Sequence, residues 1–198
     1  MSRRARLVRL DGMLLSRIAR SRLAAFEREW NYDTSYMRDI LSAGFGALRP
    51  LLGLGRMAAF RRGVPAAPWF AAKLAATRAE DCGPCLQLVV TMAERAGVAE
   101  PVLRALLAGD AAGVPEDVAL GWRFARAALA HDPAADDLRA EIERRWGRAG
   151  LVSLAYAIAV SRVYPTLKYA LGHGRACALV RVGAHESAVA PAPAAQTR

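Results

Sequence analysis

Cysteine, lysine and histidine are all scarce in this chain: its 198 residues include three cysteines, two lysines and three histidines. Three cysteines are too few for the disulfide framework of a small secreted protein. The N-terminus also lacks an apolar segment followed by a small-residue cleavage site, which a secretory leader would need. We therefore expect a cytoplasmic protein.

Signals for β-structure are equally scarce. No Asn-Gly or Asp-Gly pair joins two alternating segments, and β-branched runs are short, although 54% of the residues are hydrophobic. The apolar residues are mostly Ala, Leu and Val at helical spacing, and the length suits one domain with extensions. The sequence therefore predicts an all-α protein.

A formal net charge of +10 would ordinarily suggest nucleic acid or an anionic membrane as a partner. Here the basic residues are almost all arginine and alanine is equally abundant, a pattern that overall sequence bias produces without any binding role. We therefore expect neither nucleic acid nor a membrane as a partner. Residues 1–30 combine many arginines with leucines at helical period, which predicts a basic amphipathic helix packed on its own domain or on a neighbouring subunit.

Turn residues divide the chain into helical segments and three regions. We predict a helical extension over residues 1–62, a helical core over 63–182 and a disordered tail over 183–198. Predicted helices cover 1–30, two short segments within 35–62, then 69–77, 81–96, 99–108, 115–131, 136–146, 151–163 and 166–171. The segment 151–163 is too short to span a membrane and should form a buried central helix.

The chain is organised around the stretch Thr77–Val98, which holds the only closely spaced cysteines. Asp81 is a good helix N-cap, and Pro84 is tolerated in a first turn. Cys82 and Cys85 would then lie one turn apart on the exposed start of a helix, where the dipole favours thiolate over thiol. Two sulfurs at this spacing are able to close a disulfide.

The residues around this turn leave several alternatives open. Nearby carboxylates oppose a thiolate and Arg78 favours it, so we expect a modestly reactive pair. The alternative is a degenerate site that retains two semi-buried small residues. Zinc would need two more ligands, and the remaining candidates form no second paired motif, so we expect no metal; they are Cys177, His131, His173 and His185.

The succession of motifs is similar to the alkylhydroperoxidase D-like, carboxymuconolactone decarboxylase family. The likeness covers residues 65–175 and lies in Cys82-Gly-Pro-Cys85, Ala96-Gly97-Val98, residues 102–106, residues 124–129 and residues 151–155. It implies an all-α bundle that forms homo-oligomers, commonly trimers or hexamers, and needs no cofactor. In the redox branch the second cysteine, here Cys85, attacks a peroxide or disulfide and the first, Cys82, resolves it. The dipole argument instead favours Cys82 as the nucleophile, and we follow the resemblance.

The chain departs from that family at the proton relay. Redox-competent relatives carry a histidine and a glutamate at positions that are Val89 and Phe70 here. General base help is typically worth 10²–10⁴-fold in rate, so we expect weak activity unless Glu80 or His173 substitutes. His173 would serve only if the last helix folds back over the cysteine turn.

Two functions follow from this comparison. The first is a thiol-dependent oxidoreductase, or peroxidase-like protein, that acts on a small hydroperoxide or a disulfide with an unknown thiol reductant. The second is a catalytically degenerate helical oligomer that serves as a binding scaffold.

Overall fold

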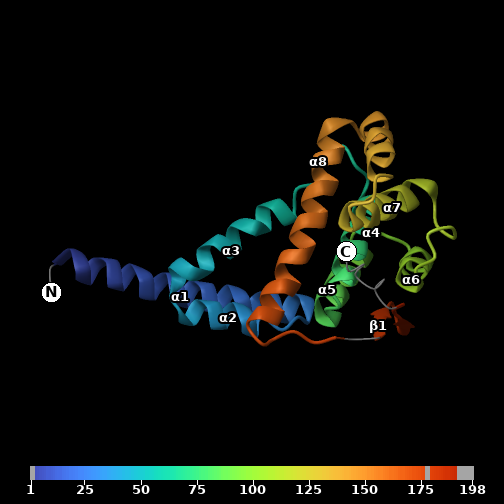
Figure 1. Ribbon diagram of the computed structural model, residues 1–198. Coiled ribbons are helices and arrows are strands. Elements are labelled where there is room, and N and C mark those ends of the chain that lie inside the picture. Colours follow the sequence, from blue (N-terminus) through green and yellow to red (C-terminus); the bar gives the residue numbers. More distant parts are fainter. Residues whose placement is uncertain (1–2, 177–178, 191–198) are drawn as a thin grey trace. The chain divides into compact units, whose positions relative to one another are not determined.

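The computed structural model describes residues 3–176 and 179–190, and it divides into two compact units, Met1–Arg56 and Met57–Arg198 (Figure 1). Cys177 lies outside the described residues. The first unit holds α1 (Arg3–Trp30), α2 (Ser35–Ser42) and most of α3 (Phe45–Ala58). The second holds α4 (Ala66–Ala79), α5 (Gly83–Arg95), α6 (Glu100–Ala108), α7 (Glu116–Ala130), α8 (Ala135–Ala170), β1 (Leu179–Val182) and β2 (His185–Ala188).

Helices dominate the described residues, which confirms the predicted helical class. The exception is the antiparallel hairpin β1–β2, which pairs Leu179 with Ala188 and Val182 with His185. The predicted disorder from residue 183 onward is therefore wrong for the hairpin residues.

Contacts with α5 explain why the hairpin is ordered. The Gln87 side chain bonds both backbone groups of Arg181, at 2.8 and 3.1 Å, and the Gly183 N–H donates to the Glu94 carboxylate at 2.6 Å. Val180 and Val182 enter the hydrophobic core. Partners so distant in sequence are not visible in the local composition that suggested disorder.

In the first unit, the loop between α1 and α2 is held by one carboxylate. Glu27 of α1 accepts hydrogen bonds from the backbone and hydroxyl of Thr34, at 3.0 and 2.7 Å, and pairs with Arg38 of α2. These contacts turn the chain back on itself after Trp30, as the predicted break at residues 31–34 requires.

Helix α4 is the centre of the second unit and packs most extensively against α7 and α8, and also against α5. Every residue from Pro68 to Thr77 is buried. A helix rich in alanine allows neighbours to approach on all sides, because small side chains do not hold the backbones apart. Because α4 is covered on all sides, it has no polar face and shows little amphipathic pattern.

The closest approach in this core is at Gly121 of α7. A Cβ added there would lie 2.3 Å from the backbone oxygen of Pro68, at the start of α4. Gly121→Ala is therefore expected to lower the free energy of unfolding by about 2 kcal/mol, because backbone atoms must move to admit the methyl group. Urea denaturation measures this loss.

The matched control for that change is Gly53→Ala in α3, where an added Cβ meets nothing within 4 Å. It is expected to leave stability unchanged or raise it by up to about 1 kcal/mol through helix propensity. Equal effects of the two substitutions would contradict the close approach.

Helix α8 joins segments that the sequence separates. Two helices meet at Gly147, whose φ of +66° and ψ of −179° interrupt the helical conformation, and Pro165 lies inside the second of them without ending it. Pro165 was expected to kink or divide this helix, and the division is wrong, because side-chain contacts with the α4–α5 turn hold the part after Pro165 in place. By length and composition α8 is able to cross a membrane, but half of its most apolar stretch is buried in the protein, which makes this weak evidence.

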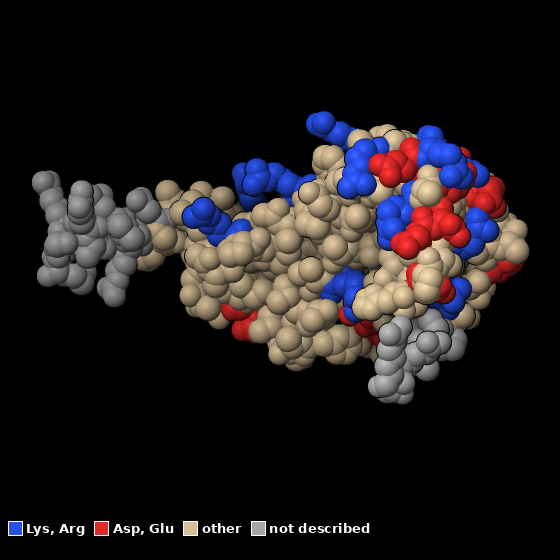
Figure 2. All heavy atoms as spheres, turned by 45° about the horizontal axis from the view of Figure 1, so that its top comes forward, with Lys and Arg blue, Asp and Glu red and all other residues tan. Residues whose placement is uncertain are grey.

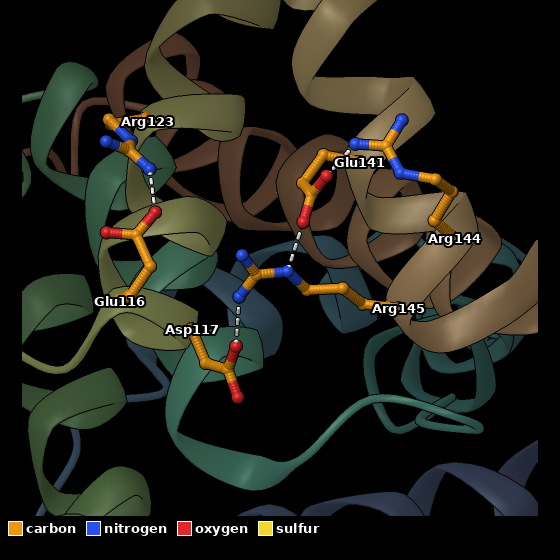
Figure 3. Close-up of polar contacts among 6 residues, drawn as sticks. All are labelled: Glu116, Asp117, Arg123, Glu141, Arg144 and Arg145. Atoms are coloured by element: carbon orange, nitrogen blue, oxygen red, sulfur yellow. Dashed lines mark hydrogen bonds and ion pairs between the residues drawn. The ribbon is translucent and has the colours of Figure 1, made fainter.

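Arginines and carboxylates alternate over one end of the second unit, where blue and red atoms lie together in Figure 2. Figure 3 shows the contacts: Arg145 pairs with Glu141 and, at 2.6 Å, with Asp117 of α7, while Arg123 pairs with Glu116 and Arg144 with Glu141. All of these side chains except Glu141 are at least one third exposed, so each pair contributes little stability. Their main consequence is that the positive charge of this region is neutralised locally.

Candidate redox site

The cysteine turn joins α4 to α5. Helix α4 ends at Ala79, Asp81 adopts a left-handed conformation with φ of +48°, and α5 begins at Gly83 with Cys82 as its N-cap. The prediction that Asp81 caps this helix is therefore wrong. Its left-handed backbone is used to reverse the chain between two packed helices, and this moves the cap position to Cys82.

The two cysteine sulfurs face each other across the first turn of α5. Cys82 Sγ and Cys85 Sγ are 2.6 Å apart, and neither residue is in a disulfide. The structure thus confirms that the N-cap and the residue three positions later share one side of the helix. Little movement is needed to reach the bond length of about 2.05 Å in a disulfide.

The predicted exposure of this turn is wrong, because Cys82 is only 1% exposed and Cys85 only 5%. The end of α8 and the segment after it lie over the turn. The Tyr169 hydroxyl donates to the backbone oxygen of Asp81 at 2.6 Å, and the Gly83 N–H donates to the backbone oxygen of Arg175 at 3.0 Å. The last helix therefore does fold back to the cysteines.

The pKa of Cys82 is lowered to about 7, chiefly because the Cys85 thiol donates a hydrogen bond to its thiolate. Burial and the charge of Asp81 act in the opposite direction, while the backbone N–H of Cys85 and the positive charge of Lys168 lower the pKa further. A thiol with this pKa is about half ionised at pH 7, so Cys82 is able to act as a nucleophile.

Lys168 is the residue that sequence reasoning missed. It lies near the end of α8, is 1% exposed and stabilises the Cys82 thiolate by its charge. Eighty-six positions separate it from Cys82, and the contact depends on the packing of α8. The one feature of the sequence that could have indicated Lys168 as a site residue is that it is one of two lysines in an arginine-rich chain.

Glu80, a predicted proton carrier, is engaged by α8. Arg162 Nε donates to one carboxylate oxygen at 2.5 Å and the Thr166 hydroxyl donates to the other at 3.3 Å. Glu80 therefore links the turn to α8. It is not among the groups that shift the pKa of Cys82.

His173, the other predicted proton carrier, lies just past the end of α8. Its side chain is half-buried, and its backbone N–H donates to the Lys168 carbonyl at 2.7 Å. The structure brings its segment to the cysteine turn, but His173 is not among the groups that act on Cys82. Lys168 and Asp81 are the charged groups that do so.

The two positions that align with the histidine and glutamate of the resembling family are part of the hydrophobic core. Phe70 and Val89 are 6% and 9% exposed, and both belong to the main cluster of buried side chains. Phe70 contacts Trp69 edge to face, with ring centroids 4.9 Å apart. No proton-carrying side chain replaces the histidine and glutamate at these two places.

Lys73 of α4 is the other lysine of the chain, and it is buried in a different environment from Lys168. Its Nζ lies 4.1 Å from the Trp69 ring centroid and donates to the backbone oxygen of Ala58 at 3.1 Å. Burial lowers the pKa of Lys73 to about 8. This ammonium is therefore a core cation rather than part of the thiol site.

A surface pocket of about 300 Å³ opens beside the first turn of α5 and is lined by Gly83, Pro84, Gln87, Arg175, Ala176 and Leu179. It lies at the helix start that carries the two thiols, and neither cysteine is among the residues that line it. Within the part of the chain that the structure describes, no three His, Cys, Asp or Glu side chains come together as metal ligands.

No protein family, curated protein or solved structure matches the chain in the comparisons made. The chemistry of the site is therefore inferred from its geometry and from the motifs that resemble the alkylhydroperoxidase D-like family.

Proposed function

We propose that this protein is a dithiol oxidoreductase in which Cys82 is the attacking thiolate and Cys85 the resolving thiol. The single observation that carries the proposal is the pair of facing sulfurs at a helix start, with the pKa of Cys82 lowered to about 7. The roles are the reverse of those that the family resemblance implies. Cys85 suits the second role because its sulfur lies 2.6 Å from the sulfur that it must join.

The reaction balances with a hydroperoxide as the oxidant. The Cys82 thiolate attacks one peroxide oxygen, the O–O bond breaks, and the alkoxide that leaves takes a proton from water to become an alcohol. Cys82 is then a sulfenic acid, and Cys85 displaces its hydroxyl as water to form the disulfide. A thiol reductant returns both cysteines to the reduced state and is itself oxidised to a disulfide.

The same proposal includes the alkylhydroperoxidase D-like bundle, assembly into a homo-oligomer and a cytoplasmic location. The mainly helical second unit supports the first of these, together with the cysteine pair at the start of a core helix. A cytoplasmic location suits the proposed cycle, because a reducing compartment would keep such a pair reduced between turnovers.

A second candidate function is a non-catalytic scaffold. The observation in its favour is that Phe70 and Val89 are core residues, so the site lacks the proton relay of active relatives. Under this alternative, Cys82 and Cys85 would be inert to peroxide.

Oxidation of the intact protein tests the proposal. After treatment with hydrogen peroxide, the tryptic peptide of residues 79–95 holds Cys82 and Cys85 and no other cysteine. It is expected to lose the mass of two hydrogen atoms and to resist alkylation. A peptide that still carries two alkyl groups would favour the scaffold.

A further inference from the structure

Helix α1 presents a row of large apolar side chains to solvent. Met13 is 65% exposed, Leu14 59%, Leu15 41% and Ile18 44%. Leu14 and Ile18 are four residues apart and therefore lie on the same side of the helix. Single exposed apolar residues are ordinary on protein surfaces, but a group on two consecutive turns marks an interaction surface.

The helix uses a different side for its own packing. Ala19 and Leu23 are 7% and 6% exposed, and α1 contacts α2 within the first unit. Met13, Leu14 and Ile18, which we call the apolar row, are thus additional to the packing face, whereas Leu15 lies four residues before Ala19 and borders that face. The sequence predicted that this helix packs on its own domain or on a neighbouring subunit. Packing within the chain accounts for one face of the helix only.

Positive charge is concentrated on the same helix. Residues 1–30 contain eight arginines and three carboxylates, which is half of the chain's net charge of +10. Arg17, Arg20 and Arg22 are exposed among and beside the apolar row. Glu27 is already engaged by Thr34 and Arg38. The arginines of α8 differ, because Asp and Glu partners neutralise them, as Figure 3 shows for Arg144 and Arg145.

Composition alone favours no membrane partner, but the exposure of the apolar row points the other way. We propose that α1 lies on an anionic lipid surface, with the apolar row in the acyl boundary and the arginines among the headgroups. Exposed apolar side chains flanked by arginine on one helix are the pattern of interfacial helices. A second copy of α1 fits less well, since pairing two such helices brings like charges together. Nucleic acid fits less well too, because phosphates leave leucine and isoleucine exposed.

Sedimentation of the full-length protein with vesicles tests this inference independently of the proposed redox function. Binding to phosphatidylcholine vesicles with 30% phosphatidylserine is expected to be at least tenfold stronger than to pure phosphatidylcholine, and 0.5 M NaCl should weaken it. The double variant Leu14→Glu, Ile18→Glu is expected to lose at least tenfold in partitioning, with an unchanged circular dichroism spectrum. Leu52→Glu is its control, because Leu52 is 48% exposed on α3.

Two triple variants that remove the same amount of charge test whether vesicle binding depends on the arginines of α1 or on the net charge of the whole protein. Removing Arg17, Arg20 and Arg22 together, each as Arg→Gln, should weaken vesicle binding at least tenfold. Removing Arg139, Arg144 and Arg148 in the same way should leave it within twofold. Equal binding to both vesicle types overturns the inference. So does loss of self-association in the Leu14→Glu, Ile18→Glu variant without any vesicle binding, which would assign the row to a second copy.

Discussion

Cys82→Ser is expected to abolish the rapid reaction of this protein with alkylating agents and peroxide at pH 7, whereas Cys85→Ser should keep it. Serine at position 85 still offers a hydroxyl that donates to the Cys82 thiolate, so the pKa of Cys82 should stay near 7. Serine at position 82 removes the thiol whose pKa Lys168 and the backbone N–H of Cys85 lower, and it leaves Cys85 as the remaining thiol of the pair.

The size of the difference follows from ionisation. A thiol with a pKa of about 7 is about half ionised at pH 7, whereas one at the ordinary value of 9.0 is ionised at about one part in a hundred. The rate of alkylation by iodoacetamide should therefore fall about 50-fold in Cys82→Ser and stay within about threefold in Cys85→Ser. Rates measured from pH 5 to 9, with the labelled cysteine identified in peptide 79–95, give both quantities.

The two variants also separate the steps of the proposed cycle. Cys85→Ser should stop after one oxidation, with Cys82 held as a sulfenic acid that dimedone traps, because the resolving thiol is gone. Faster labelling of Cys85 than of Cys82 in the unmodified protein would reverse the roles and restore those implied by the family resemblance.

The free energy of unfolding should rise with pH above 7 because of Lys73. Burial lowers the pKa of this side chain to about 8, against 10.5 in an exposed lysine. Between these two values the unfolded chain binds a proton that the folded chain does not, so the folded state gains stability as pH rises. Below pH 8 the full penalty for burying the ammonium is present, about 3 kcal/mol for a pKa difference of this size.

Urea denaturation of the wild type and of Lys73→Met at several pH values checks this expectation. Relative to the variant, the wild type should gain about 2 kcal/mol between pH 7 and 9.5, because methionine has no proton to lose. Lys73→Arg is a second comparison: its charge persists over this range, so it should show no such gain. A constant difference between wild type and Lys73→Met over the range would contradict the burial of a charged lysine.

Local sequence patterns were sufficient for the helices and for the proximity of the two sulfurs. The helix over residues 99–108 was predicted within one residue, because Pro101 and Gly109 mark its ends and the apolar residues between them repeat with helical period. The facing of Cys82 and Cys85 follows from their spacing at a helix start, since residues three apart lie on one side. These features involve neighbours within one or two turns.

Features that depend on distant partners were missed or wrong. Strand β2 was read as part of a disordered tail, because the contacts that order the hairpin come from Gln87 and Glu94 on α5. The two thiols were predicted to be exposed and are buried for the same reason, since the groups that cover them belong to α8 and to the segment that follows it.

The sequence by itself determined that this protein is mainly helical and that two thiols share the first turn of one helix. Only the tertiary structure decided that Lys168 acts on Cys82, that α8 covers the site, and that α1 keeps an apolar row exposed. The physical reason is one of range. Capping, helical period and cysteine spacing act between residues close in sequence, whereas burial and the electrostatic environment of a thiol depend on which distant segments pack around it.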